Sequence, residues 1–173
     1  MNKNSSALSL QEISTRVAKD LPLSKKLVVF PIGSNEQHGP HLPMGTDTII
    51  LEAVVQGIRK QLTADDPVVF APALPLGKSP EHLEFTGTIS LRATTLIAIL
   101  EDIVASMQKH SVKKIVFLNS HGGNTALLTS LAFDLRYSYK MDIYSLNFWN
   151  NDLIDAETMA QVIPDLPYPE IHA

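Results

Sequence analysis

The chain has 173 residues and not one cysteine. This absence excludes disulfide bonds, thiolate metal ligands and a cysteine nucleophile. No apolar run approaches the ~20 residues of a membrane-spanning helix, and the polar N-terminus lacks the apolar core of a signal peptide. Basic residues do not predominate, because 14 Lys and Arg stand against 18 Asp and Glu, a net charge of -4. We therefore expect a cytoplasmic protein that binds neither membranes nor nucleic acid.

Hydrophobic residues make up 45% of the chain and charged residues 18%, values that are ordinary for a globular domain with its own core. We expect a single domain over residues 1–173 that lacks its C-terminal part. Pro164, Pro167 and Pro169 disfavour a helix in residues 150–173, and the sequence stops there without a closing element. The alternative is a native terminus without regular structure.

Segments typical of strands and segments typical of helices alternate along the sequence. This alternation indicates an α/β fold, a three-layer sandwich with a mostly parallel sheet and helices on both faces. The Pro- and Gly-rich segment 72–86 is a long loop, and such loops in compact domains are often functional. Ser9 is the expected N-cap of the first helix. We expect helices at 9–20, 46–62, 93–109 and 124–138, and strands at 27–32, 68–71, 88–91, 115–118 and 142–146.

The segment from Glu36 to Asp47 is the most informative part of the sequence. It directly follows the apolar run 27–32 and contains two carboxylates, two histidines, two glycines and two prolines. Imidazole nitrogen and carboxylate oxygen are ligands that zinc and manganese accept. Glu36 and His38 are two residues apart, so an extended segment would turn both side chains to one face. The glycines and prolines shape a connection that could return Asp47 to the same place.

A further histidine, His121, follows the apolar run 115–118 in a second glycine-rich segment. Ligands of parallel α/β sheets bind at the carboxyl ends of the strands, which is where both segments lie. We therefore expect Glu36, His38, Asp47 and His121 to form a site for a divalent metal. Asp47 could bridge two ions. The alternative for Asp47 is the N-cap of the helix that starts there.

Other kinds of site have weaker support in the sequence. His41 could orient a ligand or shape the turn in which it lies. Gly122 and Gly123 could cradle a phosphate at a helix N-terminus, but the sequence has no GxGxxG motif and no P-loop lysine. Ser120 is not surrounded by the G-x-S-x-G of serine hydrolases. A metal site therefore remains the leading interpretation.

These motifs resemble those of a known family. Glu36–Pro43 followed by Thr46–Asp47 looks like the signature of the creatininase (creatinine amidohydrolase) family. Asn119–Asn124 is similar to its second motif, and Gly77–Leu91 resembles its substrate-side loop. Ile171–Ala173 resembles the start of a His-Ala-Gly motif that normally continues into Glu-Thr-Ser. The resemblance extends from about residue 10 to the end of the chain, with the motifs in the family's order.

The resemblance implies a metal-dependent amidohydrolase that acts on a small-molecule amide and is usually a hexamer built from dimers. The implied cofactor is zinc and/or manganese, with iron as a further candidate, at up to two ions per chain. His172 would protonate the leaving nitrogen. The implied metal ligands are Glu36, His38, Asp47, which bridges, and His121, and the residues implied near the substrate are Ser79, His82 and Asn124.

The sequence departs from the family pattern at two places. Gly123 stands where creatininase proper has a glutamate ligand, and relatives with His-Gly-Gly-Asn supply a glutamate from a segment that is absent here. Tyr168 and Pro169 stand where creatininase proper has a tryptophan and an aspartate, which argues against creatinine as the substrate. We expect a hydrolase of a non-peptide C–N bond in an amide, cyclic amide or formamide. The alternative is an inactive or partial metal-binding member of the family.

Overall fold

The computed structural model describes residues 7–148. Its strands are β1 (Leu8–Ser9), β2 (Leu27–Ile32), β3 (Val68–Phe70), β4 (Lys114–Asn119) and β5 (Asp142–Asn147). Its helices are α1 (Thr15–Lys19), α2 (Thr46–Gln61), α3 (Ala93–Lys109) and α4 (Thr125–Tyr139), with short 3₁₀ turns η1 (Leu23–Lys25), η2 (Pro80–His82) and η3 (Gly122–Asn124).

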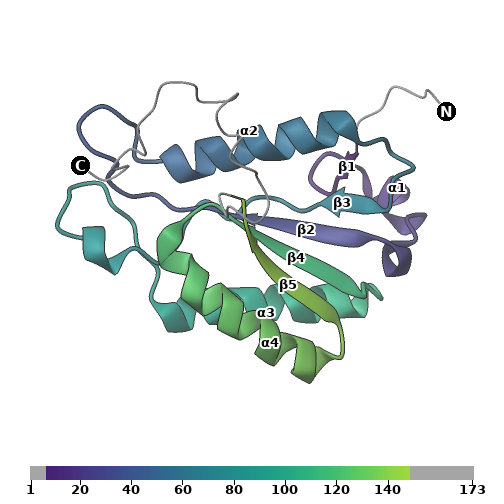
Figure 1. Ribbon diagram of the computed structural model, residues 1–173. Coiled ribbons are helices and arrows are strands. Elements are labelled where there is room, and N and C mark those ends of the chain that lie inside the picture. Colours follow the sequence, from purple (N-terminus) through teal and green to yellow (C-terminus); the bar gives the residue numbers. More distant parts are fainter. Residues whose placement is uncertain (1–6, 149–173) are drawn as a thin grey trace, which may run out of the picture.

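The five strands form one parallel sheet in the order β1-β3-β2-β4-β5. Helix α2 covers one face of this sheet, while α3 and α4 cover the other (Figure 1). The predicted three-layer α/β fold with a parallel sheet is therefore confirmed. None of the helices in the described part of the chain combines the length and apolar character needed to cross a membrane.

The sheet separates two hydrophobic cores, and the alternation of side chains along β2 supplies both of them. Phe30 and Ile32 join the core under α3 and α4, where they meet buried side chains such as Leu100. Val29 points to the opposite face and joins the smaller core under α2, together with Leu51. Burial on both faces explains why this strand reads as a continuous apolar run, and each large side chain so buried contributes about 1.5–3 kcal/mol.

The predicted helix 9–20 is wrong over most of its length. Ser9 belongs to β1, which pairs with β3, and the next residue continues the pairing through a 2.8 Å hydrogen bond from Leu10 N to Phe70 O. The helix that does form, α1, starts after Ser14, whose Oγ accepts a capping hydrogen bond. Pairing with a distant strand thus outweighs the helical spacing of the apolar residues, as tertiary contacts often do.

The predicted strand 88–91 is also wrong. It is reduced to one antiparallel bridge between Ile89 and Asn35. Its neighbours bind instead to the loop that follows β3, because Leu91 N donates to Gly77 O at 2.8 Å and Ser90 Oγ accepts from Ser79 N at 2.8 Å. These bonds fasten that loop over the carboxyl ends of the strands.

The centre of the sheet contains the place where the chain reverses its direction of winding. Strands β2 and β4 are direct neighbours, and their register ends at the pair Ile32 and Asn119. Helix α2 follows β2 on one face, whereas α4 follows β4 on the other (Figure 1). In open parallel sheets such a reversal opens a crevice at the carboxyl ends of the two strands. The four predicted metal ligands lie at this crevice.

Candidate metal centre

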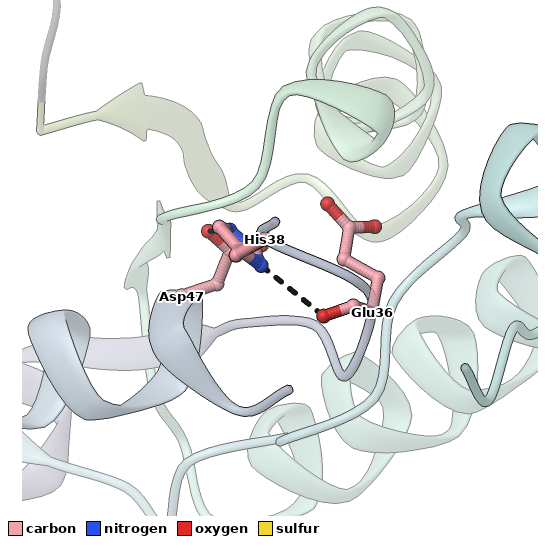
Figure 2. A group of neighbouring side chains, drawn as sticks. All are labelled: Glu36, His38 and Asp47. Atoms are coloured by element: carbon pink, nitrogen blue, oxygen red, sulfur yellow. Dashed lines mark hydrogen bonds and ion pairs between the residues drawn. The ribbon is translucent and has the colours of Figure 1, made fainter. Parts of the chain in front are cut away.

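The segments after β2 and β4 and the first turn of α2 bring the four predicted ligands together. Figure 2 shows Glu36, His38 and Asp47 in one group, and each offers a ligand atom within 4.8 Å of the others. His121 completes the group from the neighbouring strand end, with Nδ1 3.2 Å from Glu36 Oε1. The exposed fraction of the side chain is 0% for Glu36, 1% for His38, 4% for His121 and 12% for Asp47.

His38 is oriented by a backbone contact. Its Nδ1 lies 3.1 Å from the carbonyl oxygen of Glu36 (Figure 2), and a carbonyl oxygen can only accept, so we assign the ring N–H to Nδ1. Nε2 then turns its lone pair toward Asp47 Oδ1, 3.2 Å away. Proteins usually fix a metal-binding histidine by a hydrogen bond from the ring nitrogen that does not bind the metal to a carbonyl oxygen.

His121 follows the same rule with its nitrogens exchanged. Its Nε2 lies 3.0 Å from the carbonyl oxygen of Lys78, which assigns an N–H to that nitrogen. Nδ1 then faces both carboxylates, at 3.2 Å from Glu36 Oε1 and 3.1 Å from Asp47 Oδ2. Both imidazoles therefore direct one nitrogen at the same carboxylate cluster.

Two oxygens of this cluster have unsatisfied bonding capacity. Glu36 Oε1 and Asp47 Oδ2 are buried, and within residues 7–148 both form an ion pair with the single nitrogen His121 Nδ1, which does not meet hydrogen-bond geometry to either oxygen. A buried carboxylate oxygen without a hydrogen bond is costly, and a cation relieves that cost directly. The donor set and its orphaned oxygens therefore fit a divalent metal ion.

The pKa values of Glu36 and His121 in the metal-free cluster also indicate that the carboxylates favour a positive charge between them. Burial opposes ionisation of Glu36, but the contact with His121 and its charge outweigh burial and lower the pKa of Glu36 to about 2. Burial also opposes the charge on His121, but Asp47 and Glu36 raise the pKa of His121 to about 10. Without a cation, His121 is therefore doubly protonated at neutral pH, and a positive charge lies between the carboxylates.

Asp47 does not cap α2. The N-cap position belongs to Gly45, which makes no side-chain capping bond, and the two oxygens of Asp47 face His38 and His121 instead. The N-cap alternative is therefore wrong, although the positive end of the helix still favours a carboxylate in its first turn. The chain reverses after His38 at Gly39, whose φ of 70° is one that glycine adopts without strain.

The residues predicted near the substrate occupy different environments. Ser79 and Asn124 are fully buried. Asn124 Oδ1 accepts from Lys78 N at 2.9 Å, and its Nδ2 donates to Gly33 O at 3.2 Å. His82 keeps 16% of its side chain exposed, with Nε2 4.0 Å from Glu36 Oε1. Of the three, His82 alone is part-exposed, while Asn124 joins the segments around Gly33 and Lys78.

Two further residues were predicted, and the described structure places one of them. His41 is exposed on the turn before α2, whereas the side chains of the four predicted ligands are at most 12% exposed. His172 lies outside the described residues.

Sequence reasoning missed two residues that hold the ligands. Ser34 Oγ donates to Glu36 Oε2 at 3.2 Å. Asn119 clamps the backbone of His121, because its Oδ1 accepts from His121 N at 3.1 Å and its Nδ2 donates to His121 O at 2.8 Å. Both are polar residues at or just beyond the end of a buried apolar strand, and that position was the signal that could have found them.

Gly123 packs too tightly for a side chain. A Cβ there would overlap His121 Nε2 and the carbonyl oxygen of Lys78, and it would lie 3.0 Å from Glu81 Oε1. A Cβ on the neighbouring Gly122 would meet nothing within 4 Å. A glutamate at 123 is therefore excluded while the loop around Lys78 and Glu81 holds its place.

Comparisons with known proteins show the relatives of this chain. The creatininase family model, described as creatinine amidohydrolase, matches residues 11–173. A mycofactocin precursor peptide peptidase from Mycobacterium tuberculosis is 40% identical over 124 residues, which cover 68% of this chain and 49% of that protein. The creatinine amidohydrolase of Pseudomonas putida is 28% identical over 170 residues, 91% of this chain and 62% of that one.

A solved manganese form of creatininase has the same fold, with a TM-score of 0.76 and 22% identity. The alignment covers 95% of this chain and 67% of the creatininase chain. The chain spans about half the length of the mycobacterial relative.

Proposed function

The chain belongs to the creatininase family, and from that premise we propose that it is a metal-dependent hydrolase of a non-peptide C–N bond. The proposed substrate is a small molecule with an amide, cyclic amide or formamide group. One observation carries the proposal: Glu36 Oε1 and Asp47 Oδ2 are buried without a hydrogen bond, beside ring nitrogens of His38 and His121. Such mixed oxygen and nitrogen donors suit a divalent cation.

The two oxygens of Asp47 suggest how many cations the cluster holds. Oδ1 faces His38 at 3.2 Å and Oδ2 faces His121 at 3.1 Å. We therefore propose that Glu36, His38, Asp47 and His121 would hold up to two cations, and that Asp47 would be the ligand common to both. Zinc and manganese suit these ligands, with iron as a third candidate, at up to two ions per chain.

A bound divalent cation supplies Lewis-acid chemistry, which polarises a carbonyl oxygen and makes water a better nucleophile at neutral pH. The chain's own residues hold the site and orient the substrate. His82 is proposed to contact the substrate from the open side, where it remains part-exposed. Ser79 and Asn124, which are fully buried, are proposed to form the substrate side of the site together with His82, through the loops that they hold in place. His172 is proposed to deliver a proton to the leaving nitrogen.

We propose that the protein is a cytoplasmic single domain that assembles into a homo-oligomer. Its resemblance to the family suggests a hexamer. Exposed apolar side chains support assembly, since Phe133 and Tyr137 on α4 and Tyr144 on β5 are all at least 49% exposed. Patches of this kind often mark protein contacts. Light scattering on the purified protein tests the proposal, and a monomer at all concentrations would contradict it.

A second candidate function is an inactive or partial metal-binding member of the family. It is favoured by the lack of room for a carboxylate at Gly123. In that case the protein binds one cation and hydrolyses no amide.

Metal content separates these functions. Elemental mass spectrometry after gel filtration without chelator should give close to two ions per chain for the hydrolase and close to one for the partial member. Asp47→Asn removes the bridging charge and should abolish binding. Glu52→Gln, an exposed residue on the same helix, is the matched control and should bind as the parent does.

Activity is then measured on formamides, cyclic amides and a short peptide, before and after chelation. Amide hydrolysis that is lost with the metal and restored by zinc or manganese supports the hydrolase. Turnover in rigorously metal-free protein would overturn it.

A further inference from the structure

A pair of buried serines connects two of the proposed ligands. Ser34 Oγ lies 2.7 Å from Ser79 Oγ and 3.2 Å from Glu36 Oε2. Ser79 Oγ lies in turn 3.2 Å from His121 Nε2. Both serines are fully buried. Ser34 lies in the loop that precedes α2, and Ser79 lies in the loop that follows β3. A continuous line of hydrogen bonds thus runs from the glutamate to the histidine behind the cluster.

One order of donors and acceptors satisfies every bond of this line. An ionised Glu36 can only accept, so the single hydroxyl proton of Ser34 points at Oε2. Ser34 must then accept from Ser79, which has used its own proton and accepts from His121 Nε2–H. The same N–H lies 3.0 Å from Lys78 O, and it is shared between the two oxygens.

We infer that Ser34 and Ser79 are positioning residues that select which atoms of Glu36 and His121 face a bound cation. Ser34 engages Oε2, so Glu36 presents Oε1 alone and binds with one oxygen. Ser79 and Lys78 O hold the Nε2–H, so His121 presents Nδ1. This inference rests on the proposed function, because it concerns the same cation.

The hydrogen bonding of the two Glu36 oxygens supports this inference. In Glu36 the oxygen away from Ser34, Oε1, is the one that is buried without a hydrogen bond. Without the Ser34 hydroxyl, Oε2 would lose the bond that distinguishes it from Oε1, and the group could turn to bind a cation through both. Removing a partner that orients a ligand typically weakens metal affinity 10–100-fold.

Cobalt titration of the purified protein tests the inference, because Co²⁺ replaces zinc and its visible absorption depends on the number of ligands. Ser34→Ala and Ser79→Ala should each bind Co²⁺ about 10–100-fold more weakly. Their visible band should change in intensity, because Ser34→Ala no longer holds Glu36 to one oxygen and Ser79→Ala removes one of the two acceptors that orient His121. The double variant should be little weaker than Ser34→Ala alone, since both changes break the same line of bonds.

Ser120→Ala is the matched control. This serine is buried at the same edge of the sheet, and its Oγ donates to Ile32 O at 3.3 Å. Its affinity for Co²⁺ and its spectrum should equal those of the parent. Urea unfolding of each metal-free variant checks that it folds, and if Ser34→Ala does not fold, Ser79→Ala carries the test.

The experiment gives different results when the proposed function is wrong and when the inference alone is wrong. A parent protein that binds no Co²⁺ would overturn the proposed function and the inference with it. A parent that binds Co²⁺, with both serine variants equal to it in affinity and spectrum, would overturn the inference alone. Lower stability of the variants with an unchanged spectrum would also overturn it, because that result describes a merely structural role.

Discussion

His121 Nδ1 lies 3.2 Å from Glu36 Oε1, so the space between these two residues holds a proton or a metal ion but not both. Metal binding at neutral pH should therefore release a proton from His121, whose pKa is raised to about 10 by the carboxylates around it. Calorimetric titration with Zn²⁺ at pH 7, in buffers of different ionisation enthalpy, should give about one proton released per cation bound at this position. The affinity should rise with pH.

The exposed His41 supplies the control for this titration. His41→Ala should release the same number of protons as the parent. A pH-independent affinity without proton release would contradict the assignment of His121 as a ligand.

The stability of the metal-free protein should fall on the alkaline side. The pKa of His121 is raised from 6.5 to about 10, so its contribution is complete below pH 6.5 and is lost as the pH rises through 10. The pKa of Glu36 is lowered from 4.5 to about 2, so its contribution is complete above pH 4.5 and is lost as the pH falls through 2. These two groups give most stability between pH 4.5 and 6.5.

Urea unfolding in chelator between pH 5 and pH 10 measures this dependence. His121→Gln should flatten the alkaline side of the profile. A free energy of unfolding that rises from pH 6.5 to pH 10 would contradict the prediction.

Gly123→Ala should damage the site, whereas Gly122→Ala should not. The new methyl group at 123 would overlap His121 Nε2 and Lys78 O, and at 122 it would enter open space. We expect the 123 variant to lose at least about tenfold in zinc affinity, because the histidine must move from its carbonyl partner. Competition with a coloured chelator measures both variants, and equal affinities would contradict the packing described around Gly123.

Arg59→Ala should lower stability without affecting metal binding. Arg59 is buried near the C-terminal end of α2, where its Nε donates to Ala7 O at 3.0 Å and its guanidinium pairs with Glu12 through two bonds. Removing it leaves a carbonyl without its donor and loosens the N-terminal segment, at a cost of about 1–3 kcal/mol. Urea unfolding measures the loss, and the exposed Arg16→Ala is the control. An equal effect of both changes would contradict the anchoring role.

The part of the site that depends on sheet topology could be predicted from the sequence. Glu36 and His121 follow different apolar runs, and the rule that parallel strands end at one edge was enough to bring them together. The contact between Ser34 and Ser79 could not be predicted in this way. Their contact joins two loops 45 residues apart, and no local pattern encodes which loops meet.

The two errors in the fold have a common cause. Leu10 has helical spacing to Val17, but its backbone bonds to Phe70 in a distant strand. Ile89 lies in a segment of strand-like composition but finds only one backbone partner, Asn35. Local spacing predicts what a segment could form alone, whereas the partner on the sheet decides what it does form.

The pairing of β2 with β4 gives a bound cation the role of a cross-link. Glu36 and His121 are brought side by side only after β4 has joined β2, so the complete set of ligands does not exist in the early stages of folding. A cation would therefore add little to the folding rate. It would instead lower the unfolding rate, because the two strands cannot separate until the ion dissociates. The metal-loaded protein should therefore be long-lived because it unfolds slowly.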